Sequence, residues 1–162
     1  MKRMLLSCLV VVATLFSASS LYTDAPARRH LVISKQRLLL SVVEGSDTVW
    51  QAPVCCGKNK GNKQRRGDKR TPEGTFKIKS IEKASHWTHD FGDGAGERKG
   101  AYGDWFLRLD VPHFNSIGIH GTCFPESIGT RDSEGCIRLH NEDLNRLKEM
   151  VFVGMICIIE PD

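Results

Sequence analysis

Two short segments, IGIHGT at residues 117–122 and SEGCIRL at residues 133–139, contain the pattern from which the fold of this chain is best read. The first is an apolar run that ends on His120. The second places Cys136 sixteen residues later, between a glycine and another apolar run. Aliphatic and β-branched runs that are broken by turn residues predict short strands. We therefore expect His120 at the end of a strand and Cys136 at the start of the next apolar segment.

Similar short strands are predicted on both sides of these segments. The expected strands are Leu31–Ser34, Arg37–Val43, Thr48–Cys55, Gly74–Ser80, Trp105–Asp110, Ile117–His120 and Met155–Ile159. Residues 76–79 and 105–109 alternate with period two, as a half-buried sheet requires. Residues 44–47 predict a hairpin turn.

One helix is predicted over Asn141–Met150, with Asn141 as its N-cap and two acidic residues in its first turn. Leu144, Leu147 and Val151 recur at helical spacing and form one apolar face. Together these elements predict a mainly β fold, a β-sandwich of mixed sheets with one docked helix.

The chain has 162 residues and a formal net charge of +4, and 40% of its residues are hydrophobic. This length fits one domain with a single buried core, which we place at residues 30–160. The composition excludes a disordered or collagen-like chain. The modest charge gives little support to nucleic-acid binding.

The N-terminus has the pattern of a secretory signal peptide over residues 1–20, with cleavage between residues 19 and 25. Lys2 and Arg3 precede an apolar run from Leu5 to Phe16, and small residues follow it. The run is short for a membrane span, so an uncleaved anchor is the weaker alternative. Almost no apolar run precedes Cys8, which argues against lipidation there. We expect an exported protein with no stable span in the mature chain and no nucleic-acid partner.

Six cysteines are present, and five remain after the leader. An odd number in an exported protein leaves at least one thiol unpaired. The adjacent Cys55 and Cys56 could pair with Cys123 or Cys157, and the sequence does not fix the connectivity.

Cys136 and His120 are residue types that thiol catalysis needs, because an imidazole activates the sulfur and nearby backbone N–H groups hold an oxyanion. Gly135 would let the main chain approach a substrate, and Ser133 could fix the turn. Two alternatives remain open at this point. Cys136 and His120 could be ordinary buried residues, or His120, Cys123, Cys136 and His140 could bind zinc.

The order His120-Gly121-Thr122, then Ser133-x-Gly135-Cys136-Ile137-Arg138-Leu139, resembles the signature of the L,D-transpeptidase (YkuD-like) catalytic domain. Residues 33–36, 53–54 and 71–76 resemble earlier segments of that family, so the resemblance covers about residues 30–160. It implies a bacterial enzyme of peptidoglycan metabolism in the periplasm or cell envelope. It also implies a β-sandwich, a cysteine nucleophile, no metal and no cofactor.

Matched to the family's motif, Cys136 would be the nucleophile and His120 the general base, oriented by a main-chain carbonyl near Gly121. Backbone N–H groups around Gly135 and Cys136 would form the oxyanion hole. Arg138 would shape the pocket or meet a substrate carboxylate. The resemblance also puts Gly121, Thr122 and Ser133 in the substrate-binding region.

The implied reaction begins when Cys136 attacks the bond between the diamino-acid residue of a peptidoglycan tetrapeptide stem and its terminal D-Ala. Transfer to an amine of a second stem gives a 3-3 cross-link. Water as acceptor would make the enzyme an L,D-carboxypeptidase, and a protein amine would attach that protein to the wall. A zinc-stabilised wall-binding module is the non-enzymatic alternative.

Two positions depart from the family pattern. Glu134 would oppose thiolate formation if it pointed at Cys136, so we predict that it faces away or toward an amine. Cys123 stands where relatives often have asparagine, and a nearby Cys136 could form an inactivating disulfide with it.

Two segments lack strand character. Lys58–Arg70 holds seven basic residues and one acid and carries +6, whereas the rest of the chain after the leader sums to −4. The simplest interpretation is a solvated surface loop, although it could attract anionic wall polymers or stem carboxylates. Ala84–Gly103 is glycine-rich and contains Trp87 and Tyr102, which suggests a lid or a plain excursion between strands.

Overall fold

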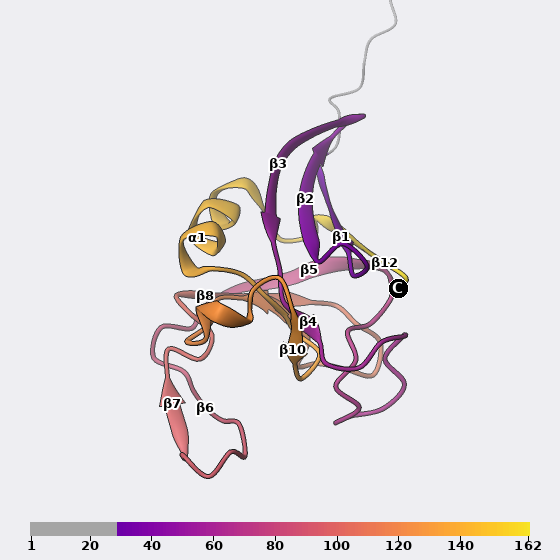
Figure 1. Ribbon diagram of the computed structural model, residues 1–162. Coiled ribbons are helices and arrows are strands. Elements are labelled where there is room, and N and C mark those ends of the chain that lie inside the picture. The colour runs from indigo at the N-terminus through magenta and orange to yellow at the C-terminus, as the bar shows by residue number, and fades with distance from the viewer. Residues whose placement is uncertain (1–28) are drawn as a thin grey trace, which may run out of the picture.

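The longest strand, β5 (Gly74–Lys83), joins the two halves of one curled, mixed, eight-stranded sheet (Figure 1). This computed structural model describes residues 29–162, so the predicted signal peptide lies outside the described residues. The sheet has the strand order β11-β9-β8-β5-β12-β1-β2-β3. The prediction of a mainly β fold with mixed strands and one helix is confirmed, and the eight strands belong to one curled sheet.

The first half of the sheet contains the chain termini of the described region. The first residues of β5 pair antiparallel with β12, which pairs parallel with β1, and β1, β2 and β3 continue antiparallel. These strands are β1 (His30–Ser34), β2 (Leu39–Glu44), β3 (Asp47–Pro53) and β12 (Ile156–Glu160). The predicted hairpin between β2 and β3 is present. The predicted strand start at Arg37 was wrong, because a turn with a positive φ of 51° at Leu38 precedes β2.

The second half of the sheet carries the candidate site. The last residues of β5 pair antiparallel with β8 (Trp105–Leu109), and β8 pairs antiparallel with β9 (Gly118–His120). The edge strand β11 (Ile137–Arg138) runs parallel to β9, and His120 and Arg138 are partners in the register. This pairing puts the residue before β11, Cys136, beside the end of the strand that carries His120.

Several short elements were not predicted. β4 (Cys56–Gly57) pairs with β10 (Arg131–Ser133), and a 3-10 helix spans Pro125–Ser127. The glycine-rich segment contains a hairpin of β6 (Thr88–Asp90) and β7 (Glu97–Lys99), which projects away from the main sheet (Figure 1). The expectation that this segment lacks strands was therefore wrong.

The predicted helix is confirmed with its bounds as α1 (Asn141–Met150). It packs against β8 and buries Leu144 and Leu147 completely, a burial that stabilises the fold by about 1.5–3 kcal/mol per side chain. The N-cap is His140, which makes no capping side-chain bond, so the predicted cap at Asn141 was wrong. Within residues 29–162, none of the helices is long and apolar enough to span a membrane.

Candidate active site

Cys136 lies in a tight turn between β10 and β11. The Ser133 hydroxyl donates to the Cys136 carbonyl at 2.5 Å and accepts from the Gly135 N–H at 3.1 Å, which confirms that Ser133 fixes the turn. Gly135 has a φ of +130°, and a Cβ there would lie 2.8 Å from the Arg70 carbonyl oxygen. Only glycine fits this position, because its backbone is strained for other residues and Arg70 leaves no space.

The same turn changes the expected source of the oxyanion hole. The bond to Ser133 occupies the Gly135 N–H that we expected to be a donor. Among residues 29–162, no hydrogen bond engages the Cys136 N–H. The Cys136 N–H is therefore a backbone donor that this turn leaves available for an oxyanion.

His120 is buried at the end of β9, with 4% of its surface exposed. Its ring stacks on Phe106 with a centroid distance of 5.4 Å, and its Nδ1–H donates to the Gly121 carbonyl at 2.6 Å. The predicted orientation by a main-chain carbonyl is confirmed. This bond leaves Nε2 as the nitrogen with a lone pair.

The charge state of His120 follows from its burial. Burial lowers its pKa to about 3, the nearby positive charge of Arg138 and the ring of His89 act in the same direction, and the Gly121 carbonyl opposes them. His120 is thus a neutral imidazole at physiological pH. A neutral imidazole with a free Nε2 can accept a proton.

Asn141 holds the loop that follows His120, a role the sequence did not reveal. Its side-chain oxygen accepts the Thr122 N–H at 2.9 Å, and its Nδ2 donates to the Thr122 carbonyl at 3.2 Å. A Cβ on Gly121 would lie 2.1 Å from that oxygen, so the two residues fit only with glycine at position 121. An asparagine at the start of a helix is also typical of a cap, and the sequence holds no signal that separates the two roles.

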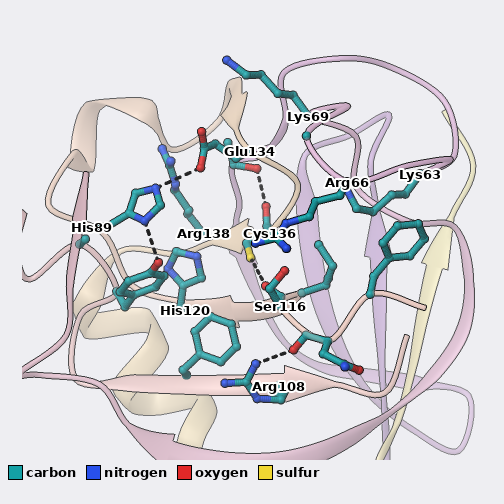
Figure 2. A pocket seen from close by; sticks show the side chains of 18 of the residues that line it. Lys63, Arg66, Lys69, His89, Arg108, Ser116, His120, Glu134, Cys136 and Arg138 are labelled. Carbon is teal, nitrogen blue, oxygen red and sulfur yellow. Dashed lines mark hydrogen bonds and ion pairs between the residues drawn. The ribbon is translucent and has the colours of Figure 1, made fainter. Parts of the chain in front are cut away.

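The Cys136 thiol opens into the same pocket as His120 (Figure 2). It donates to the Ser116 carbonyl at 3.3 Å, and within residues 29–162 no hydrogen bond joins it to His120. Burial raises the pKa of Cys136, and the Gly118 backbone and the positive charges of Arg138, Lys63 and Arg108 lower it by less. The resting pair is therefore a thiol and a neutral imidazole.

The pocket has a volume of about 720 Å³ and contrasting walls. Its aromatic wall consists of Trp87, His89, Phe91, Tyr102 and Phe106, and its basic side chains are Lys63, Arg66, Lys69, Arg108 and Arg138. Of the predicted site residues, the pocket is lined by His120, Ser133, Cys136 and Arg138. Gly121, Thr122 and Gly135 are not among the lining residues, and their place in the substrate-binding region stays a prediction.

A family model describes the L,D-transpeptidase catalytic domain and matches residues 28–159 of this chain. The chain belongs to this family. Proteins of the family act on the peptides of peptidoglycan.

Proteins from bacilli are similar to this L,D-transpeptidase domain. YkuD of Bacillus licheniformis is 44% identical over 62 residues, a stretch that covers 38% of this chain and 36% of that protein. YqjB of Bacillus subtilis is 26% identical over 139 residues, which is 85% of this chain and 74% of YqjB. The match thus spans about a third of the length of YkuD.

Solved L,D-transpeptidases share the fold. The enzyme from Mycobacterium smegmatis aligns with a TM-score of 0.62 and 19% identity, over 83% of this chain and 59% of that one. The enzyme from Enterococcus faecium aligns with a TM-score of 0.62 and 17% identity, over 82% and 49%. At these identities the likeness describes the fold alone.

In this L,D-transpeptidase domain, Glu134 turns toward the projecting hairpin (Figure 2). Its Oε2 lies 3.0 Å from Nε2 of His89, and Nδ1 of His89 lies 3.1 Å from the Tyr102 hydroxyl. Of the two predicted orientations, away from Cys136 or toward an amine, the first is the one observed, because Glu134 faces the imidazole of His89. This contact links the hairpin directly to the turn that carries Cys136.

The other cysteines do not pair. All five cysteines in residues 29–162 are free, so the suggested disulfides are absent, because Cys55, Cys56 and Cys157 are buried in separate strands or bridges of the core. Burial raises the pKa of Cys56 and Cys157 to about 12, which makes these thiols unreactive.

The described residues contain no cluster of three His, Cys, Asp or Glu side chains able to hold a metal ion, so the zinc-module alternative is not favoured.

Proposed function

We propose that this protein is an exported peptidoglycan L,D-transpeptidase in which Cys136 is the nucleophile and His120 the general base. One observation carries the proposal: a thiol and a neutral imidazole, its Nδ1–H fixed by the Gly121 carbonyl, open into one pocket in a chain of this family. The buried thiols of Cys56 and Cys157 are poor nucleophiles. Of the five cysteines in residues 29–162, Cys136 is the one that lines the pocket together with His120, which makes it the best placed for the reaction.

The first half-reaction forms a thioester. Rotation about the Cys136 Cα–Cβ bond turns the thiol from the Ser116 carbonyl toward Nε2 of His120, which takes the proton as sulfur attacks the peptide carbonyl. The Cys136 N–H donates to the resulting oxyanion. When the C–N bond breaks, protonated His120 gives its proton to the amine of the departing D-Ala.

The second half-reaction consumes the thioester. His120 takes a proton from the side-chain amine of a second stem, the C–N bond forms, and the C–S bond breaks. The proton returns to the sulfur, and the product is a 3-3 cross-link. Water in place of the amine would release a tripeptide, and a protein amine would give attachment to the wall.

Incubation with a disaccharide-tetrapeptide, followed by mass spectrometry, tests the proposal. The wild type should release D-Ala and form a dimer, and Cys136→Ala should do neither. Cys123→Ala is a matched control, because Cys123 is a free and partly exposed thiol outside the pocket lining. D-Ala with tripeptide alone would identify a carboxypeptidase. An inert wild type, or an active Cys136→Ala variant, would refute the assignment.

A further inference from the structure

The basic segment Lys58–Arg70 is an ordered wall of the pocket. Asp68 organises it: its carboxylate accepts Nζ of Lys63 at 2.8 Å and the backbone N–H groups of Gln64, Arg65 and Arg70 at 2.7, 3.1 and 3.1 Å. Burial alone would raise the pKa of Asp68, but these donors hold it well below its usual range. The expected surface loop is present, with Arg66 and Lys69 exposed, but these hydrogen bonds give it a fixed shape and Lys63 is buried in it.

Lys35 anchors this segment at Gly61 and at Thr71, the residue that follows the segment. The ammonium of Lys35, which is 0% exposed, donates to the Gly61 carbonyl at 3.1 Å and the Thr71 carbonyl at 3.4 Å. The backbone of this segment is therefore held in one shape, which fixes the points from which its basic side chains extend.

Three basic side chains of the pocket have no carboxylate partner. Lys63 pairs with Asp68, and Arg108 pairs with Glu82 at 2.8 Å. Arg66, Lys69 and Arg138 make no ion pair with any residue in 29–162, and Arg138 is only 4% exposed. The carboxylate among the lining residues, that of Glu134, faces His89. The pocket thus keeps a surplus of positive charge.

Among the basic side chains that the segment Lys58–Arg70 contributes to the pocket, that of Arg66 points toward the candidate nucleophile. Figure 2 shows Arg66 extended toward Cys136, whereas Lys69 points away from it. In the same view the Arg138 side chain extends toward Glu134 and His89, and its guanidinium lies over the Phe91 ring, 5.5 Å from the ring centroid. The pocket therefore holds two guanidinium groups without a carboxylate partner, and that of Arg66 is directed toward the candidate nucleophile.

We propose that Arg66, together with Arg138, selects stem peptides whose carboxylates are free over stems in which they are amidated. This inference rests on the proposed function and names the substrate class of the same site. A guanidinium can bind a carboxylate through two charge-assisted hydrogen bonds. A carboxamide is neutral and also presents an N–H₂ group that a guanidinium cannot accept from. Arg66 acts here as a specificity residue and takes no part in the proton transfers.

The local potential at Cys136 can be measured without any stem peptide. Cys136 is alkylated at low salt with anionic iodoacetate and with neutral iodoacetamide, and peptide mapping by mass spectrometry gives the rate at Cys136 alone. The rate with iodoacetate divided by the rate with iodoacetamide should fall about three- to ten-fold in Arg66→Gln, as expected when one positive charge near the thiol is removed. Arg65→Gln is the matched control, because Arg65 is the adjacent exposed arginine and lies outside this pocket. An equal ratio in all three proteins would overturn the inference.

The selectivity itself is measured with tetrapeptide stems that have free carboxylates and with stems amidated at one carboxyl group at a time. In the wild type, kcat/KM should be about ten-fold higher for the stem with free carboxylates than for at least one of the singly amidated stems. Arg66→Gln should lose this preference by slowing only on the free stem, Arg66→Lys should restore part of it, and Arg65→Gln should keep it. A wild type active on all stems without preference contradicts the inference and leaves the proposed function intact. A wild type inert on all stems refutes the proposed function. The alkylation ratio then still tests whether Arg66 attracts anions to Cys136.

Discussion

At the residue scale, the reactivity of this site is governed by burial. Burial holds His120 neutral and keeps the Cys136 thiol protonated, so the two groups do not rest as a thiolate and an imidazolium. The sequence allowed both residues to be selected, because each is next to a glycine, with His120 at the end of one apolar run and Cys136 at the start of another. It could not indicate Asn141 or Arg66, since Asn141 bonds to the distant residue Thr122 and Arg66 extends toward Cys136 from another segment.

The resting protonation states predict how Cys136 reacts with pH. Its pKa lies above the usual value and that of His120 is about 3, so between these values neither group is charged. Alkylation of Cys136 by iodoacetamide should therefore rise about ten-fold per pH unit from pH 6 to 9, because only the thiolate reacts. A rate that stays constant between pH 5 and 7 would indicate a preformed ion pair and contradict this account.

Removal of the Asn141 side chain should loosen the loop after His120. Asn141→Ala deletes two hydrogen bonds to Thr122, and we expect it to lower the free energy of unfolding by about 1–2 kcal/mol in urea titrations. Asn145→Ala, on the same helix, removes an exposed bond to Asp104 and should cost less than about 0.5 kcal/mol. Equal effects of the two variants would mean that Asn141 does not hold the loop.

At the element scale, strand length decides what could be predicted. β5, β8 and the β2–β3 hairpin are long enough to show alternation or a turn signal, and they were found. β4, β10 and β11 have two or three residues each, too few to show a period, and they exist because neighbouring strands offer hydrogen-bonding partners. The β6–β7 hairpin was missed because its glycine-rich connection hid two three-residue strands.

The contact between the β6–β7 hairpin and the Cys136 turn predicts a local effect. Glu134→Ala removes the partner of His89, so hydrogen exchange at residues 88–99 should become faster. Global stability should change by less than about 0.5 kcal/mol, because the pair is largely exposed. Glu149→Ala, which breaks an exposed pair on α1, serves as the control and should leave exchange in the hairpin unchanged. Unchanged exchange in Glu134→Ala would show that this contact does not hold the hairpin.

At the scale of the whole molecule, one buried charge network joins distant parts of the chain. Lys35 pairs with Glu73 at 2.6 Å and with Asp162 at 3.1 Å, and Asp162 also pairs with Arg131. The network connects the end of β1, the basic wall, β10 and the last described residue. In the sequence, Lys35 is only one residue of a segment that resembles the family. Its burial could not be predicted, because a lysine is buried only where other segments supply partners for its charge, and here three segments do so.

Loss of Lys35 should therefore destabilise the molecule strongly. Lys35→Ala leaves two carboxylates without their buried partner, and we expect the free energy of unfolding to fall by about 3–5 kcal/mol. Lys60→Ala removes an exposed lysine from the basic wall and is the control, with an expected change below about 0.5 kcal/mol. Denaturant titration of both variants measures the difference. A loss below about 1 kcal/mol for Lys35→Ala would show that the network does not stabilise the fold.

The most direct measurement of the central claim is the mass of the protein trapped during turnover of a disaccharide-tetrapeptide. The wild type should gain the mass of the substrate minus D-Ala, peptide mapping should place this adduct on Cys136 as a thioester, and free D-Ala should appear with it. Cys136→Ala should gain no mass. An adduct on another residue, or release of D-Ala by Cys136→Ala, would contradict the account.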